Sequence, residues 1–140
     1  MHRLFLDTNI VLDFLDRQRV DHEKAKALIK DIVVNEHQVV ISEDMLSTVY
    51  YIHKEKPKVL DFFETILKEW EVVPYGPKVI AQAIAHCRMS GEDFEDALQC
   101  LCAKENGCIY IVTSDKGFAQ CGVEIVDYDG YFGSSTDLVH

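Results

Sequence analysis

Four aspartates stand in the sequence where a divalent metal site could form. Asp7 and Asp115 each follow a short apolar run, and Asp93 and Asp96 stand at the start of a helical pattern. Carboxylate oxygens without His or Cys nearby favour Mg²⁺ or Mn²⁺ over zinc. A pair of such ions can activate water and stabilise the leaving oxygen of a phosphodiester. These residues therefore predict metal-dependent phosphodiester hydrolysis, with Glu43 as a further metal ligand at the margin of the site.

The elements that must position these acids follow from apolar periodicity. Apolar and β-branched runs predict strands at residues 4–6, 39–41, 71–73, 109–112 and 123–126. Apolar residues at helical spacing predict helices at residues 10–15, 21–33, 43–54, 57–68, 77–89 and 94–105. We predict the order β-α-α-β-α-α-β-α-α-β-α-β. This order indicates a three-layer α/β/α sandwich around a central, mainly parallel sheet of four to five strands.

Parallel topology brings the acids together. The carboxyl ends of all parallel strands lie at one sheet edge, where ligands of open α/β folds bind. Asp7, Glu43 and Asp115 follow strands. The helix that starts near Asp93 and Asp96 precedes a strand and runs antiparallel to it, so its amino end lies at the same edge. Each acid alone can be explained as a helix cap or first-turn acid. Several together need a cation, because like charges raise one another's pKa.

The composition describes a single folded domain with an acidic excess. The 140 residues are 48% apolar and carry a formal charge of -10. Because phosphate affinity comes largely from basic side chains, this charge opposes loose binding to nucleic acid or anionic lipid. No apolar run approaches the roughly 20 residues that span a bilayer, so we expect a cytoplasmic protein without a membrane segment or signal peptide. We assign the domain to residues 1–133 and a flexible tail to residues 134–140.

The five cysteines form no metal-binding pattern. They include neither a C-x-x-C pair nor a paired histidine spacing. Zinc binding through Cys100 and Cys102 is disfavoured, because side chains two apart on a helix point away from each other. We expect all five to be core or half-buried thiols in a reducing compartment.

Three motifs in order give the sequence a family resemblance. Asp-Thr-Asn at residues 7–9 follows the opening strand, Phe-Glu-Asp-Ala-Leu spans 94–98, and Ile-Val-Thr-Ser-Asp-Lys-Gly-Phe spans 111–118. This set resembles the PIN-domain family of metal-dependent ribonucleases, and is most similar to its small single-domain members, which include VapC-type toxins. The resemblance extends over nearly the whole chain.

The resemblance implies roles for individual residues. It implies that Asp7, Asp96 and Asp115 are the catalytic residues and hold Mg²⁺ or Mn²⁺, with Asn9 and Thr113 supporting the site. It also implies hydrolysis of RNA by water, leaving a 5′-phosphate.

Two positions depart from the family pattern. The family usually has a glutamate six residues beyond a serine like Ser42, and this place is held by Thr48. We predict Thr48 as a further residue that supports the site. We expect either Glu43 or Asp93 to substitute as a metal ligand, or the metal site to be weaker. Gly117 stands where many members carry an acid.

Other functions fit the residues less well, with one exception. Haloacid-dehalogenase phosphatases need a second aspartate two residues after the first, where this chain has Asn9. Receiver-type phosphoacceptors need paired acids after the first strand and a lysine near the last, where Asp127 stands. The remaining alternative, motivated by Thr48, is a catalytically weakened PIN-like domain that serves as an RNA- or protein-binding module.

Two short segments supply candidate contacts for RNA. Lys54, Lys56 and Lys58 form the most concentrated basic group, and Arg17 and Arg19 follow the first predicted helix. The lysines are also explained by favourable interaction with a helix carboxyl end. If the chain is toxin-like, the resemblance further implies a cognate antitoxin and a homodimer.

Overall fold

The computed structural model describes residues 1–139, with side chains described through Gly133. Twelve elements are assigned in this range. They are β1 (Arg3–Leu6), α1 (Thr8–Leu15), α2 (His22–Val34), β2 (Gln38–Ser42), α3 (Asp44–Ile52), α4 (Lys56–Glu69), β3 (Glu71–Val73), α5 (Gly76–Ser90), α6 (Phe94–Glu105), β4 (Tyr110–Val112), β5 (Glu124–Val126) and α7 (Tyr128–Val139). No helix in this range is long and apolar enough to cross a membrane.

All five strands form one parallel sheet in the order β3-β2-β1-β4-β5. The predicted α/β sandwich with a parallel sheet is thereby confirmed. Central β1 pairs with β2 on one side and β4 on the other, with Leu4 opposite both Val39 and Tyr110. Because helices cover both faces, the central strands are buried on both sides and are apolar without alternation.

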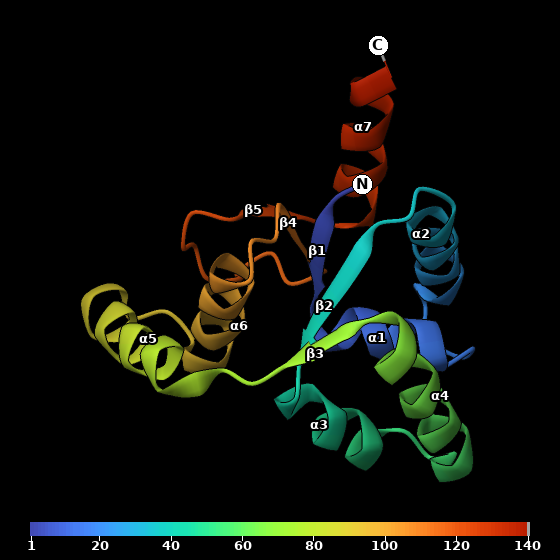
Figure 1. Cartoon of the computed structure of the whole chain (residues 1–140), viewed down its shortest axis with the longest axis horizontal. Coiled ribbons are helices and arrows are strands. Elements are labelled where there is room, and N and C mark those ends of the chain that lie inside the picture. The colour runs from blue at the N-terminus through green and yellow to red at the C-terminus, as the bar shows by residue number, and fades with distance from the viewer. Residues whose placement is uncertain (140) are drawn as a thin grey trace.

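Alternate residues of the central strands enter two separate cores. Leu4 and Val39 pack into a core formed with α1, α2 and α4. Phe5 and Ile111 point to the opposite face, where α5 and α6 cover the sheet. Figure 1 shows this layering, with α2 on one side of the sheet and α5 and α6 on the other. The two layers fix α1 and α6 on opposite faces, so that their amino ends meet at the carboxyl edge of the sheet.

The predicted order is wrong after β4. A helix was expected between the last two strands, but the described residues 113–123 form turns, and α7 follows β5 instead. The turn is stabilised by Asp115, whose Oδ1 accepts from Gly117 N at 2.9 Å and whose carbonyl accepts from Phe118 N at 3.3 Å. Phe118 and Ala119 are then buried. This burial holds the connection against α6 without a helix.

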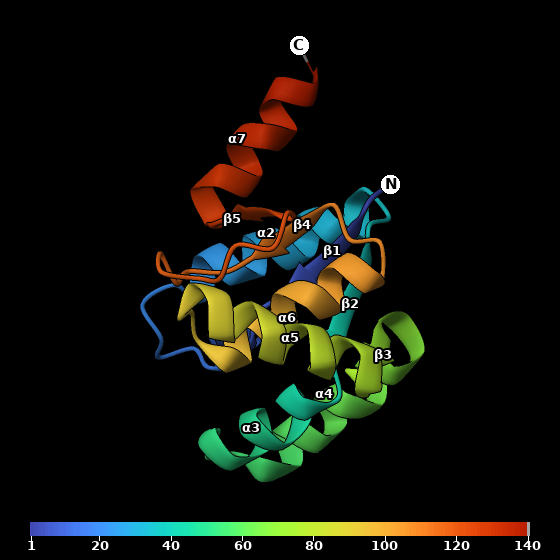
Figure 2. The same cartoon turned by 90° about the vertical axis from the view of Figure 1, so that its left-hand side faces the viewer.

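A helix, α7, follows β5 where the sequence predicted none. Figure 2 shows α7 extending away from the body of the molecule beyond β5. Its backbone continues through Val139, so most of the segment 134–140 is helical. That this segment moves independently of the domain stays a prediction.

The expectation of five free thiols is wrong for two cysteines. Cys100 of α6 forms a disulfide with Cys121, with Cα atoms 6.0 Å apart. The pairing depends on the turn that folds residues 113–123 back over α6, and the spacing of the cysteines in the sequence does not indicate it. The other three, Cys87, Cys102 and Cys108, are free and buried or half-buried, as expected.

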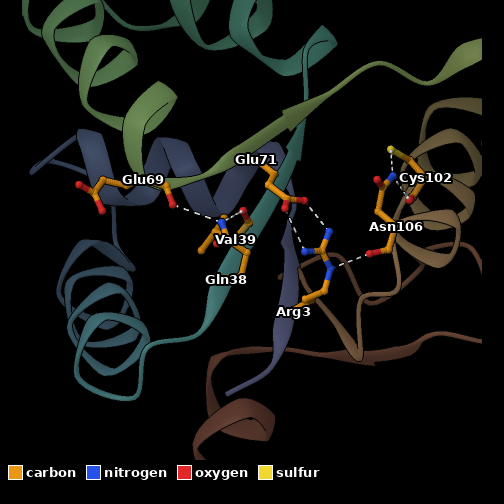
Figure 3. Close-up of polar contacts among 7 residues, drawn as sticks. All are labelled: Arg3, Gln38, Val39, Glu69, Glu71, Cys102 and Asn106. Atoms are coloured by element: carbon orange, nitrogen blue, oxygen red, sulfur yellow. Dashed lines mark hydrogen bonds and ion pairs between the residues drawn. The ribbon is translucent and has the colours of Figure 1, made fainter.

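A polar cluster secures the amino edge of the sheet, far from the acids. The Arg3 guanidinium donates to both Glu71 carboxylate oxygens, at 3.1 and 2.5 Å, and to the Asn106 carbonyl at 2.8 Å. Asn106 in turn donates to the Cys102 carbonyl at the end of α6 (Figure 3). These contacts join β1, β3 and α6, so they fix the helix whose opposite end carries Asp96.

Candidate metal centre

Asp7 lies at the end of β1 and caps α1. Its Oδ1 accepts from Thr8 N at 2.7 Å, and its side chain is largely buried, with the residue only 5% exposed. The cap position explains the Asp-Thr-Asn pattern, because a carboxylate at this place satisfies an otherwise unpaired amide of the first turn. Burial raises the pKa of Asp7, while hydrogen bonds from Thr113, Thr8 and Gln99 lower it. The charged form is thus costly unless donors or a cation stabilise it.

Thr113 joins Asp7 to the loop that carries Asp115. Its hydroxyl donates to Asp7 Oδ2 at 2.8 Å and accepts from the backbone N–H of Asp115 at 3.1 Å. Thr113 is buried, whereas Asp115 is exposed. A single hydroxyl therefore links the carboxylate of Asp7, at the end of β1, to the backbone of Asp115, which follows β4.

The amino end of α6 brings two further acids to this edge. Asp93 caps the helix and accepts from the backbone N–H of Asp96 at 3.0 Å. Burial, followed by the charges of Asp93, Asp115 and Asp7, raises the pKa of Asp96 to about 7. The carboxylates of β1, α6 and the β4 loop therefore lie near enough for the charges of Asp7 and Asp115 to act on Asp96. Such convergence is the condition under which a divalent cation is favoured.

Two acids that the sequence analysis did not select belong to the same cluster. The pKa of Glu95 is raised by burial and then by the charges of Asp44, Asp93 and Asp7. Asp44 begins α3 directly after the second strand, so the strand-end rule that selected Glu43 could also have found it. Glu95 adjoins Asp96, and its helical position alone gave no signal.

The predicted ligand Glu43 lies at the margin. It is exposed, and its backbone N–H donates to the carbonyl of Val73 at 2.9 Å. In the described part of the chain, Asp44 is the acid at the start of α3 whose charge raises the pKa of Glu95. Glu43 stays a predicted ligand, and Asp44 is its structural competitor.

The two remaining supporting candidates differ in burial. Asn9 is exposed in the first turn of α1, and Thr48 is half-buried in the second turn of α3. Thr48 offers a hydroxyl where the family has a carboxylate. This position therefore carries no negative charge.

The donor chemistry of the cluster fits a hard divalent cation. In the described chain, no three His, Cys, Asp or Glu side chains are grouped closely enough to ligate a metal. Two polar atoms at this edge, Ser42 Oγ and Gln99 Oε1, are nevertheless buried without a hydrogen-bond partner. Such orphaned groups are uncommon and call for a bound polar species. Carboxylates with raised pKa values beside buried oxygens without a partner are the hard oxygen donors that Mg²⁺ and Mn²⁺ prefer.

The basic candidates separate into two groups. Lys56 donates to the carbonyls of Tyr50 and His53, so it caps the end of α3. The other four, Arg17, Arg19, Lys54 and Lys58, line one cavity away from the acids.

Comparison with known proteins gives consistent matches. The family model for the PIN domain matches residues 4–124. Ribonuclease VapC1 of Aquifex aeolicus is 31% identical over 130 residues, which cover 89% of each chain. Among solved structures, VapC20 of Mycobacterium tuberculosis, a toxin that cleaves the sarcin-ricin loop, has a TM-score of 0.68 at 16% identity. The match covers 86% of this chain and 95% of that one. FitAcB of Neisseria gonorrhoeae has a TM-score of 0.66 at 18% identity, covering 89% and 97%.

Proposed function

Since the chain belongs to the PIN-domain family, we propose that it is a VapC-like ribonuclease that hydrolyses RNA phosphodiester bonds with Mg²⁺ or Mn²⁺. The observation that carries this proposal is the hydrogen bond from Thr113 to buried Asp7, which joins the end of β1 to the loop that carries Asp115. The charges of Asp7 and Asp115 also act on Asp96 at the start of α6. A relative that shares 31% of its residues over 89% of the chain is named as a ribonuclease, which supports the same activity.

The chain's own residues prepare the site for catalysis. Asp7, Asp96 and Asp115 would hold the metal, with Asp93 and Glu43 as further proposed ligands. When bound, a divalent cation supplies positive charge for the phosphate and lowers the pKa of water. Thr113 holds the carboxylate of Asp7 in one orientation through its 2.8 Å hydrogen bond. Asn9 is the second proposed supporting residue.

The test combines Mn²⁺ titration by calorimetry with RNA cleavage. We expect Asp7→Asn and Asp96→Asn each to lose tight Mn²⁺ binding and to reduce cleavage about a thousandfold or more, because each removes a charged ligand. Asp61→Asn is a matched control, since Asp61 is exposed on α4. Absence of Mn²⁺ binding to the wild type at millimolar metal would overturn the catalytic proposal.

The second candidate function is a catalytically weakened PIN-like module that binds RNA or protein. It is favoured by Thr48, which carries no negative charge. The variant Thr48→Glu separates the two functions. A gain in Mn²⁺ affinity together with faster cleavage would mean that the wild type is an attenuated enzyme. No cleavage by either protein would favour the binding module.

An antitoxin is the proposed protein partner. The solved relatives include toxin–antitoxin complexes from Rickettsia felis and Klebsiella pneumoniae. In this chain, α3 and α4 enclose a mainly apolar hollow of about 740 Å³ lined by Tyr50, Tyr51 and Leu60. Tyr51 is 87% exposed beside the partly exposed Tyr50 and Leu60, and a contiguous exposed apolar patch marks a protein interaction site. We expect Tyr51→Asp to retain RNA cleavage in vitro but to escape neutralisation by a co-expressed antitoxin.

A homodimer in the cytoplasm completes the proposal. Ile80 and Ile84 are both partly exposed one turn apart on α5, and this apolar face supports self-association. Light scattering of the wild type against Ile84→Glu measures the oligomeric state. A monomeric mass for the wild type would remove the dimer from the proposal.

A further inference from the structure

A second charged region lies where α1 and α3 end. The His53 ring contacts the Leu15 carbonyl at 3.3 Å and joins the two carboxyl ends. Beside this contact is a cavity of about 390 Å³. Its charged lining consists of four bases and two acids: Arg17, Arg19, Lys54, Lys58, Asp16 and Glu55. A basic lining is unusual in a chain of net charge -10, and we call this feature the basic cavity.

Two of the four cations already have partners, and two do not. Arg19 forms an ion pair with buried Asp13 at 2.7 Å, and Lys58 lies 3.8 Å from Glu55. Arg17 and Lys54 are exposed, and in the described part of the chain neither has an ion pair. The acid Asp16 accepts a hydrogen bond from Gln18 N at 2.9 Å. Arg17 and Lys54 are therefore available for an external anion.

The basic cavity and the acidic cluster lie at opposite ends of the same two helices. Asp7 and Asp44 stand at the amino ends of α1 and α3, while Arg17 and Lys54 follow their carboxyl ends. The eight residues of α1 separate the two regions by about 12 Å. A single polyanion a few nucleotides long can reach from one to the other.

We propose that the basic cavity binds a backbone phosphate of the RNA, a few nucleotides from the bond that is cleaved. This inference rests on the proposed ribonuclease function. Arg17 supplies a planar guanidinium that can pair with two phosphate oxygens, and Lys54 adds a second positive charge. Phosphate contacts of this kind fix the register of a nucleic acid without reading its bases. The competing occupant is an acidic segment of a protein. The carboxylate cluster lies one helix length away and would repel the carboxylates of such a segment, with no cation to bridge the two.

The test is the double substitution Arg17→Gln with Lys54→Gln. For single strands, each lost phosphate contact contributes a factor of about 5 at about 0.1 M salt, so two contacts amount to about 25-fold. With Mn²⁺ present, we expect the KM for a short oligouridylate to rise about 25-fold while kcat is unchanged. The matched control is Lys30→Gln with Lys68→Gln, which removes the same charge from exposed sites. This control should leave KM within about twofold.

A binding measurement keeps this inference separate from the catalytic one. Fluorescence anisotropy of labelled oligouridylate without divalent metal gives the slope of log affinity against log salt. The cavity variant should reduce that slope by about 1.4, which corresponds to two contacts. Equal slopes and equal KM values for the cavity and control variants would overturn the inference even if the wild type cleaves RNA. Loss of affinity for a polyglutamate peptide instead of RNA would overturn it in favour of a protein partner. A wild type that binds RNA through the basic cavity but does not cleave it would refute only the enzyme.

Discussion

The two ends of the α1–α3 pair carry opposite charge and are built differently. At the amino ends, Asp7 is buried and hydrogen-bonded to Thr113, which directly follows β4, so the acids at the ends of β1 and β4 are coupled. At the carboxyl ends, Arg17 and Lys54 are exposed on two separate connections. Buried charges perturb one another strongly, whereas exposed ones act almost independently. Substitutions at the acidic end should therefore act together, and those at the basic end should add.

The largest expected effect on folding concerns the disulfide at the acidic end. Cys100 lies one turn beyond Asp96 on α6, and Cys121 lies in the loop that carries Asp115. Replacing both by alanine should lower the free energy of unfolding by about 3 kcal/mol, because the closed loop restricts the unfolded chain. Urea denaturation measures this loss. A reductant should weaken the wild type equally and leave the double variant unchanged.

Cys87→Ala is the matched control for this comparison. Cys87 is a free, half-buried cysteine on α5, and its substitution leaves the covalent link intact. It should not reproduce the sensitivity to reductant. If reduction leaves wild-type stability unchanged, the disulfide does not hold the acidic end together.

A smaller effect is expected from the hydroxyl that couples Asp7 to the Asp115 loop. Thr113→Val keeps the side-chain shape and removes the donor at 2.8 Å. Loss of a group that orients a metal ligand typically costs 10- to 100-fold in metal affinity. Calorimetry with Mn²⁺ should show this weakening. The control is Thr65→Val, because Thr65 is exposed on α4. Equal Mn²⁺ affinities for the two variants would mean that Asp7 is positioned without Thr113.

The strand-end rule explains why part of this site was predictable. Asp7 and Asp115 follow apolar strands, and Asp96 starts a helix that returns to the sheet, so topology alone brings them together. The alternation of predicted strands and helices also indicated the parallel sheet and the α/β/α sandwich. The same strand-end rule could also have selected Asp44, whereas Glu95 was missed because its role depends on which way α6 presents its first turn. That orientation is set by packing, which single-sequence periodicity does not encode.

The basic cavity was predictable only in part for a related reason. Arg17 and Lys54 lie 37 positions apart in the sequence, and their meeting depends on α1 and α3 having similar lengths and ending side by side. Lys56 carries the same charge but turns back to cap α3. Charge type is visible in the sequence, but side-chain direction at a helix end is set by local carbonyls. The disulfide and the missing helix after β4 follow from the same limitation, since both depend on how residues 113–123 fold over α6.

The basic end offers a smaller test of stability. Tyr128 of α7 donates to Asp13 Oδ2 at 2.8 Å, and Asp13 also holds Arg19. Tyr128→Phe removes a buried hydrogen bond to a charged group and should cost about 2 kcal/mol of unfolding free energy. RNA cleavage should keep its KM, because Arg17 and Lys54 do not depend on this contact. A raised KM would instead show that the basic cavity depends on the contacts of Asp13 with Tyr128 and Arg19.

The smallest expected effect is a dependence of stability on pH that belongs to the acidic end alone. In the folded chain without metal, the pKa of Asp96 is raised to about 7 by burial and by Asp93. The folded state thus binds this proton more tightly than the unfolded chain, so the contribution is fully present below the ordinary pKa of 3.8 and is lost as the pH rises from there through about 7.

Melting temperatures measured without metal at pH 5 and pH 8 test this sign. The wild type should lose a few degrees more than Asp96→Asn between these values. Because the difference between the two proteins cancels the titration of unrelated groups, it isolates Asp96. Saturating Mn²⁺ should reverse the trend for the wild type only, since a cation that prefers the ionised carboxylates stabilises the state that binds it. An identical pH response for both proteins, with and without Mn²⁺, would mean that Asp96 does not belong to the coupled acidic cluster.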